Sequence, residues 1–333
     1  MTGSPEADVT VIGSGSWATA IVKMLSTNAT KICWYVQIDE ELKYLKKFHH
    51  NQKYLSAIDF KPEKLILTGD INKAIKSAEI IILVTPAAFL KETLSPLKIS
   101  LNGKTICSAI KGFIPEDNCI VGEFMHKEYN VPYSDIVIIT GPSHAEEVAM
   151  EKLTYLTIAS QDSERARNVA RLLKNHYLRT ILSDDIYGTE YAAVMKNIFA
   201  IAAGICIGLG YGDNFLAVLL SNAAMELKTF IDSIHPIDRD IKCSAYLGDL
   251  LVTGYSQFSR NRAFGTMIGK GYSVHNALME MTMVAEGYYA AKGIHKLRSE
   301  MNLSIPIAET VYRILYENAI PSKEVIRLTK ILK

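Results

Sequence analysis

The feature that most constrains this fold is a glycine-rich turn close to the beginning of the sequence. The turn reads Gly13-Ser14-Gly15-Ser16-Trp17-Ala18, and it separates an apolar run at 8–12 from a segment with helical spacing at 18–26. In dinucleotide-binding domains the first glycine of such a turn permits the tight bend, and the second lets a pyrophosphate approach the backbone. A glycine turn without a ligand is the alternative, but the strand and helix context that the motif requires is present. Gly13 and Gly15 are therefore expected to bind a dinucleotide.

The turn opens a stretch in which short β-branched runs alternate with helical segments. Run 79–85 is apolar without alternation, as a strand buried on both faces should be. The alternation predicts an α/β fold of the Rossmann type, with a doubly wound, mainly parallel sheet and helices on both faces. The predicted strands are 8–12, 31–36, 65–68, 79–85, 104–108, 136–140, 153–159 and 177–182, and the clearest helices between them are 18–26, 40–47, 87–94 and 164–174.

The strand pattern stops after Asp184-Asp185, and a helical pattern continues to the last residue. We therefore expect two domains. A dinucleotide-binding Rossmann domain is predicted at 1–185, and an all-helical substrate and catalytic domain at 186–333.

Charge and hydropathy exclude some classes of partner. Lys plus Arg number 36 and Asp plus Glu number 35, so no global field attracts nucleic acid or an anionic membrane. The most apolar long stretch, 192–210, contains Lys196. A lysine in hydrocarbon costs about 3 kcal/mol on insertion scales, so a buried helix of a soluble protein is expected instead of a membrane segment. An anionic substrate would need a local cluster of donors.

The cysteines indicate a reducing compartment. They are scattered singly, without metal-ligand spacing, so buried free thiols and no metal site are expected. The first residues, 1–6, are polar and lead directly into a strand, which predicts no signal peptide and a cytoplasmic location. The five cysteines are Cys33, Cys107, Cys119, Cys206 and Cys243.

Polar residues follow two of the predicted strands. Lys111 comes after 104–108, and the turn Gly141-Pro142-Ser143-His144-Ala145 comes directly after 136–140. Doubly wound sheets bind ligands at the carboxyl ends of their strands, so both segments are candidates for the site. The Ser143 hydroxyl could equally cap a helix that begins at His144.

The second domain carries its own candidates. Lys196 stands beside Asn197 in a helix that is apolar on almost every face. Desolvation lowers the pKa of a lysine and suits it to proton transfer near neutral pH, although a lysine whose head reaches water is the alternative. Asp213-Asn214 is expected to cap the next helix. The densest polar cluster is formed by Gly248-Asp249, Thr253 and Ser259-Arg260-Asn261-Arg262.

These motifs together resemble one family, the bacterial-type NAD(P)-dependent glycerol-3-phosphate dehydrogenases. The resemblance covers nearly the whole chain, and the order of its blocks is far more specific than the glycine turn alone. The blocks are 13–20, Asn51-Gln-Lys-Tyr54-Leu, Lys111-Gly112, 141–145, Lys196-Asn197, Gly210-x-Gly212-Asp213-Asn214, Gly248-Asp249-Leu with Thr253, Ser259-Arg260-Asn261, and Val284-x-Glu286-Gly287.

The resemblance implies roles for individual positions. The positions expected to contact NAD or NADP are Gly13, Gly15, Ser16, Trp17, Gln37, Tyr54, Lys111, Ala145, Arg260, Val284 and Glu286. The positions expected around the phosphorylated substrate are Lys111, Gly141, Ser143, Lys196, Asn197, Asp249, Thr253, Ser259, Arg260 and Asn261.

The resemblance also implies a reaction, which is reversible hydride transfer between the nicotinamide and dihydroxyacetone phosphate, for glycerophospholipid synthesis. Lys196 matches the family's proton donor and acceptor, Asp249 would hold its ammonium, and Lys111 would stabilise the reacting oxygen. A homodimer is common in the family. A related reductase of a β-hydroxyacid or a 2-keto acid, or a dinucleotide-sensing protein without chemistry, is the alternative.

Three departures from the family pattern stand out. After the second strand the family commonly has Arg or His, whereas this chain has Val36-Gln37, with neither an acid nor an arginine. Asn222 stands near the place of a frequent arginine, and Tyr246-Leu247 precedes Gly248 where small residues are common. The choice between NAD and NADP therefore stays open.

Overall fold

A computed structural model describes residues 5–281 and 283–333. Their contacts divide the chain into two compact units. The first comprises the described part of Met1–Ile110 together with Val121–Ile186, and the second comprises Lys111–Ile120 and the described part of Tyr187–Lys333. The domain boundary at residue 185 remains a prediction. That boundary assigns the short segment Lys111–Ile120 to the first domain, whereas the contacts group this segment with the helical unit.

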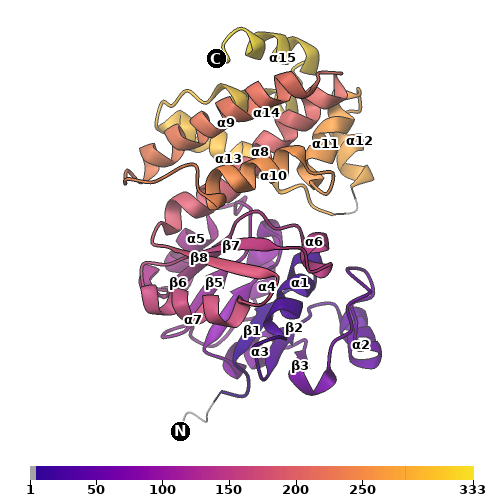
Figure 1. The fold of residues 1–333 in the computed structure, drawn as a ribbon, viewed down its shortest axis with the longest axis vertical. Coiled ribbons are helices and arrows are strands. Elements are labelled where there is room, and N and C mark those ends of the chain that lie inside the picture. The colour runs from indigo at the N-terminus through magenta and orange to yellow at the C-terminus, as the bar shows by residue number, and fades with distance from the viewer. Residues whose placement is uncertain (1–4, 282) are drawn as a thin grey trace. The chain divides into compact units, whose positions relative to one another are not determined.

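The first unit is built on one sheet of eight strands in the order β3-β2-β1-β4-β5-β6-β7-β8 (Figure 1). All pairs are parallel except β6 with β7, so the predicted doubly wound, mainly parallel sheet is confirmed. The order reverses between β1 and β4, and their carboxyl ends form the switch point where such sheets bind ligands. The strands are β1 Val9–Ile12, β2 Ile32–Tyr35, β3 Leu65–Thr68, β4 Ile80–Leu83, β5 Thr105–Ser108, β6 Ile136–Thr140, β7 Thr154–Ala159 and β8 Leu178–Ser183.

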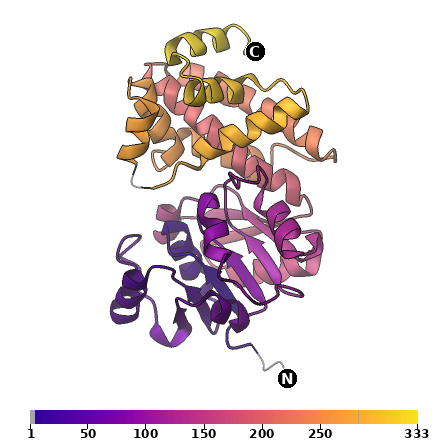
Figure 2. The same ribbon diagram turned by 180° about the vertical axis from the view of Figure 1, so that it is seen from behind.

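Helices cover both faces of this sheet (Figures 1 and 2). Val9 and Val11 of β1 belong to the same core as the buried residues of α1 and α7. Thr10 points to the other face, because side chains alternate along a strand, and there its hydroxyl donates to the Ala74 carbonyl of α3 at 2.8 Å. The helices are α1 Ser16–Leu25, α2 Asp39–Phe48, α3 Ile71–Ser77, α4 Leu90–Leu94, α5 Val121–Tyr129, α6 Ala145–Ala149 and α7 Ser163–Leu173.

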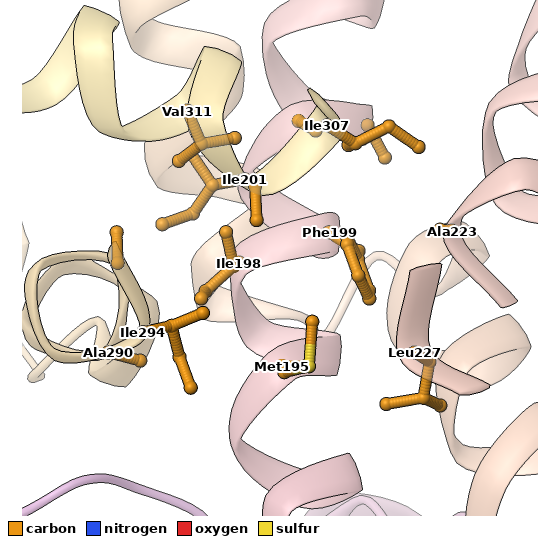
Figure 3. Close-up of a cluster of buried hydrophobic side chains, with 14 of the residues drawn as sticks. Met195, Ile198, Phe199, Ile201, Ala223, Leu227, Ala290, Ile294, Ile307 and Val311 are labelled. Atoms are coloured by element: carbon orange, nitrogen blue, oxygen red, sulfur yellow. The ribbon is translucent and has the colours of Figure 1, made fainter. Parts of the chain in front are cut away.

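In its described part, the second unit contains helices and no strand, as predicted. Its longest helix, α8, is apolar enough to cross a membrane by composition, but 89% of the relevant window is buried inside the protein, as in a core helix. Figure 3 shows Met195, Ile198 and Phe199 of α8 among apolar side chains of the surrounding helices. The helices are α8 Ile186–Gly208, α9 Asp213–Ile234, α10 Asp249–Tyr255, α11 Arg260–Gly269, α12 Val274–Glu280, α13 Glu286–Glu300, α14 Pro306–Tyr316 and α15 Pro321–Thr329.

Helices α8 and α11 cross with their backbones in close approach. A Cβ atom added at Gly204 would lie 2.1 Å from the Arg262 carbonyl oxygen, and one at Gly265 would lie 2.2 Å from the Ile201 carbonyl oxygen. Only glycine permits this distance, because the clashing atoms belong to main chain that cannot move aside. The crossing places the first turn of α11, with Arg260 and Asn261, beside the helix that carries Lys196.

Candidate active site

The glycine turn has the geometry that a pyrophosphate site requires. Gly13 has a φ of +126°, and a Cβ there would lie 3.0 Å from the main chain of Val84, which follows β4. The indole nitrogen of buried Trp34, on β2, donates to the Gly13 carbonyl at 2.7 Å and holds the bend in place. Gly13 is thus held by the switch point of the sheet, and no other residue type fits it.

The space above the turn suits a dinucleotide. A Cβ at Gly15 would meet no atom within 4 Å, so this side of the turn is open. Gly15 is also the N-cap of α1, which receives no hydrogen bond from a capping side chain. An open backbone at the N-terminus of a ten-residue helix is a site for a phosphate group. Gly13, Gly15, Ser16 and Trp17 lie along this edge, and the residues present fit the cofactor.

Other predicted residues of the first unit lie in segments after β2 and β6 and in the segment between α2 and β3. The Gln37 side-chain oxygen accepts a hydrogen bond from the Thr93 hydroxyl at 3.2 Å. The Tyr54 amide donates to Asn51 Oδ1 at 3.1 Å. Gly141, with a φ of +111°, follows β6, and Ala145 begins α6.

The N-cap expected of Asp213 is wrong, and Ser143, for which capping was one of two possibilities, does not occupy the N-cap position of α6. The Ser143 hydroxyl donates to the Gly141 carbonyl at 2.9 Å, and the N-cap residue of α6 is His144, whose side chain makes no capping hydrogen bond. The N-cap of α9 is Gly212, so Asp213 is the first helical residue and makes no cap. Ser259, by contrast, caps α11 by accepting from the Arg262 amide at 3.3 Å.

The second unit brings together the predicted ionisable residues. Lys196 Nζ lies 2.6 Å from Asp249 Oδ1 and donates to the Thr253 hydroxyl at 3.1 Å. Lys111 Nζ lies 3.2 Å from the other carboxylate oxygen, Asp249 Oδ2. Asp249 is 1% exposed, so one buried carboxylate is shared by two ammonium groups. We call Lys111, Lys196, Asp249 and Thr253 the lysine centre.

Burial dominates the electrostatics of the lysine centre. Burial is the main cause that lowers the pKa of Lys196 from 10.5 to about 7; the charge of Lys111 acts in the same direction, and the Asp249 carboxylate opposes both. An ammonium with a pKa near neutrality can give and take a proton at working pH. The lysine whose head reaches water, the alternative considered above, is excluded because Lys196 is 6% exposed.

Local structure positions the carboxylate. The segment η4, Ser244–Gly248, is a π-helical turn that leads directly into α10 at Asp249. Such wide turns are frequent at functional sites because they re-aim the residues that follow. Thr253 stands one turn after Asp249, and its hydroxyl donates to the Asp249 carbonyl at 2.7 Å while it accepts from Lys196. Residue spacing alone gave no signal for the π-helical turn.

Two buried amides connect neighbouring segments to the lysine centre. Asn197 Nδ2 donates to the Lys111 carbonyl at 2.6 Å, which ties the segment Lys111–Ile120 to α8. Asn261 Oδ1 accepts from the Gly287 amide at 2.9 Å, next to Glu286 at the start of α13. Arg260 is exposed and its guanidinium lies 3.7 Å from the sulfur of Met283, one residue before Val284. Among the described residues, no group of three His, Cys, Asp or Glu side chains could hold a metal ion.

Two residues of the first unit were not predicted to be part of the site. The Ser14 hydroxyl, inside the glycine turn, donates to Glu41 Oε2 of α2 at 2.8 Å. Asn51, which belongs to a block of the resemblance but was given no role, donates to the Ser14 carbonyl at 2.8 Å. For Asn51 the sequence signal was that block. For the contact of Ser14 with Glu41 it was the run of acids Asp39-Glu40-Glu41 at the start of a predicted helix.

A Rossmann-type sheet with an open glycine turn, together with a helical unit that buries a lysine of lowered pKa, defines a two-domain nicotinamide-dependent dehydrogenase. Two family models match the chain. The model of the N-terminus of NAD-dependent glycerol-3-phosphate dehydrogenase matches residues 8–166, and the model of its C-terminus matches residues 185–326. The chain belongs to the NAD-dependent glycerol-3-phosphate dehydrogenase family.

Individual relatives agree with this assignment. The chain is 35% identical to glycerol-3-phosphate dehydrogenase (NAD(P)+) from Lactobacillus johnsonii, covering 96% of both chains. It is 35% identical to the protein of the same name from an Exiguobacterium species, covering 97% of this chain and 95% of the relative. The crystal structure of glycerol-3-phosphate dehydrogenase from Coxiella burnetii has a TM-score of 0.90 at 27% identity, covering 97% of this chain and 99% of that one.

Proposed function

We propose that this protein is an NAD(P)-dependent glycerol-3-phosphate dehydrogenase, which interconverts dihydroxyacetone phosphate and sn-glycerol 3-phosphate and supplies glycerophospholipid synthesis. The observation that carries the proposal is the lysine centre, in a chain that also carries the glycine turn. A bound nicotinamide supplies or accepts the hydride. Family membership favours this reaction over the β-hydroxyacid and 2-keto acid reductases, and a centre of two lysines and a carboxylate argues against a sensor without chemistry.

In the reductive direction Lys196 donates a proton to the substrate oxygen, and in the oxidative direction it removes that proton. Its ammonium has three hydrogens, and within the described chain Asp249 and Thr253 accept two of them. The third is available to a substrate oxygen. Lys111 adds a second positive charge near the developing alkoxide, an effect of about 3 kcal/mol if it resembles other oxyanion donors.

Arg260 and Asn261 are proposed to bind the phosphate group, with help from Ser143. A guanidinium and an amide give a phosphate the forked donors that it accepts best. The glycine crossing of α8 with α11 supports this assignment, because it fixes the start of α11 relative to Lys196. Binding of the remote phosphate orients the carbonyl for reaction.

The test compares NADH oxidation with dihydroxyacetone phosphate and with unphosphorylated dihydroxyacetone. We expect kcat/KM for the phosphorylated ketone to be higher by about 100-fold or more, as for two lost charge-assisted hydrogen bonds. Arg260→Ala should raise KM for dihydroxyacetone phosphate much more than KM for the unphosphorylated ketone. Equal activity on both ketones would contradict the proposed substrate, and unchanged KM values in Arg260→Ala would contradict the phosphate role.

A cytoplasmic location and a homodimer are further proposals. The location is supported by five free cysteines; three are buried as expected, whereas Cys119 is partly exposed and Cys243 is exposed. The dimer is supported by the resemblance to the family alone. Light scattering after gel filtration should give twice the chain mass of 37.0 kDa.

A further inference from the structure

A carboxylate lies against the glycine turn where the end of the second strand offers none. Glu41 belongs to the first turn of α2, and its Oε2 accepts from the hydroxyl of Ser14, the residue between Gly13 and Gly15, at 2.8 Å. The Glu41 side chain is 12% exposed, so its position is set by the fold. This contact is unrelated to the lysine centre.

Carboxylates at this place in a Rossmann domain decide between the two nicotinamide dinucleotides. An acid close to the end of the second strand accepts a hydrogen bond from the adenosine ribose 2′-hydroxyl and repels a 2′-phosphate, whereas an arginine favours the phosphate. Here β2 is followed by Val36-Gln37, and the Gln37 oxygen is bonded to Thr93. Glu41 is the acid that reaches the turn instead.

The surrounding charges favour a neutral ribose over a phosphate. Asp39, Glu40 and Glu41 all lie in the first turn of α2. Lys53 is engaged by Glu41, with Nζ 2.9 Å from Oε1, and this hydrogen bond raises the pKa of Lys53. A phosphate beside Ser14 would meet the Glu41 carboxylate and a lysine already paired with it.

The segment that carries Lys53 is fixed to the same turn. Asn51 is 8% exposed and donates to the Ser14 carbonyl at 2.8 Å and to the Thr19 hydroxyl at 2.9 Å. Its side-chain oxygen accepts from the amides of Lys53 and Tyr54. Segment 51–54 and the glycine turn are therefore one hydrogen-bonded unit, which holds the backbone of Lys53 beside Glu41.

We propose that Glu41 sets the dinucleotide preference of this protein, and that the protein binds NADH more tightly than NADPH. The proposal rests on the proposed function only in requiring that the glycine turn binds a nicotinamide dinucleotide. Glu41 would accept the ribose 2′-hydroxyl, and Ser14 and Lys53 hold the carboxylate in place for it. Gln37, uncharged and bonded to Thr93, offers a phosphate no counter-charge.

The test measures the dissociation constants of NADH and NADPH with the whole protein in the absence of substrate, by quenching of reduced-nicotinamide fluorescence. For the unmodified protein we expect NADH to bind more tightly by about tenfold or more, the value of one hydrogen bond to a charged group. Glu41→Gln should bring the two dissociation constants closer together, because NADPH should bind more tightly and NADH more weakly. Tighter or equal binding of NADPH by the unmodified protein would overturn the proposal.

Matched variants separate Glu41 from simpler explanations. Glu40→Gln removes the same charge from the same helical turn at an exposed position, and it should leave the ratio within about twofold, as a screened surface charge does. An equal effect of both variants would assign the preference to net charge and overturn the role of Glu41. Lys53→Met should not weaken the binding of NADPH more than that of NADH. A selective loss of NADPH binding would identify Lys53 as a ligand of the 2′-phosphate and would contradict the proposal.

Two further outcomes keep the proposal distinct from the proposed function. If Glu41→Gln does not fold, Ser14→Ala removes the bond to the carboxylate without a charge change and should also narrow the ratio; an unchanged ratio would overturn the proposal. Failure of both dinucleotides to bind would overturn the proposed function together with this inference. Equal binding of both, with normal turnover of dihydroxyacetone phosphate, would overturn this inference alone.

Discussion

Lys196 and Glu226 are both ionisable side chains buried on successive long helices, α8 and α9, yet they are held in different ways. Burial lowers the pKa of Lys196 to about 7 and raises that of Glu226 to about 8. Lys196 contacts other side chains, Asp249 and Thr253. Glu226 accepts hydrogen bonds from two main-chain amides, those of Ile307 at 2.5 Å and Ala308 at 3.3 Å.

The partners explain the difference in role. The amides of Ile307 and Ala308 lie in the first turn of α14, directly after Pro306, where a helix has no internal acceptor for them. Glu226 therefore satisfies the amides at a helix end, and we expect no catalytic role for it. Lys196 is held by side chains on one face of α10 and keeps one hydrogen for a further acceptor. A near-neutral pKa marks a catalytic group only when its partners leave it a free donor or acceptor.

The largest effect should come from Lys196→Ala. We expect kcat to fall by about 10²- to 10⁴-fold, the usual contribution of a general acid or base, with little change in the dissociation constant of NADH. Steady-state reduction of dihydroxyacetone phosphate and a separate NADH titration measure the two effects. Lys228→Ala, an exposed lysine on α9, is the control and should keep full activity. If Lys196→Ala retained substantial turnover, Lys196 would not be the proton donor, and the contrast with Glu226 would disappear.

Asp249→Asn should give the next largest effect and shift the pH profile. Burial lowers the pKa of Lys196 and the Asp249 charge raises it, so loss of that charge moves the pKa below about 7. The reductive reaction requires the ammonium, so its falling limb should move to lower pH, and kcat at pH 7 should fall by roughly 10- to 100-fold. The oxidative reaction requires the neutral amine, so its rate at low pH should increase relative to the rate of the reductive reaction. An unshifted limb in pH–rate profiles would show that Lys196 does not titrate in the observed step.

Glu226→Gln should change stability and leave kcat unaffected. The folded pKa of Glu226, about 8, lies above the ordinary 4.5, so the fold binds more protons than the unfolded chain between these values. The contribution is complete below pH 4.5 and is lost as the pH rises to 8, with a slope of up to about 1.4 kcal/mol per pH unit. Urea unfolding at pH 5 to 8 should show this slope in the unmodified protein and a flatter dependence in Glu226→Gln. Glu300→Gln, an exposed position on α13, should keep the original slope.

Lys196 contributes with the opposite sign. Its folded pKa of about 7 lies below the ordinary 10.5, so its contribution to stability grows as the pH rises from 7 to 10.5. Between pH 7 and 8 the contribution of Glu226 to the free energy of unfolding therefore falls with pH, while that of Lys196 rises. Urea unfolding between pH 8 and 10 should show a free energy of unfolding that rises with pH in the unmodified protein and a flatter dependence in Lys196→Met; equal slopes in the two proteins would contradict the contribution of Lys196.

The same comparison shows what sequence can predict. The sheet and the glycine turn were predictable because β-branched runs and a Gly-x-Gly motif are local signals. Lys196 was recognisable because a lone charge in an apolar helix has few interpretations. Glu226 was not, since its reason for burial is the end of a helix about eighty residues further along the chain. The close approach of Gly204 to α11 and the contact of Glu41 with Ser14 also depend on which helices meet, and local sequence does not specify that.

The smallest effect, and the sharpest test of the contrast between side-chain and main-chain partners, should come from Thr253→Val. The change keeps the shape of the side chain but removes the hydroxyl that accepts from Lys196 and donates to the Asp249 carbonyl. Loss of one hydrogen bond worth about 1 kcal/mol should lower kcat roughly fivefold and leave the dissociation constant of NADH unchanged. Thr266→Val on α11 removes a similar bond, from the hydroxyl to the carbonyl four residues before it, and is the matched control. If both variants lowered kcat equally, the effect would come from helix packing, and Thr253 would have no role in orienting the Lys196 ammonium.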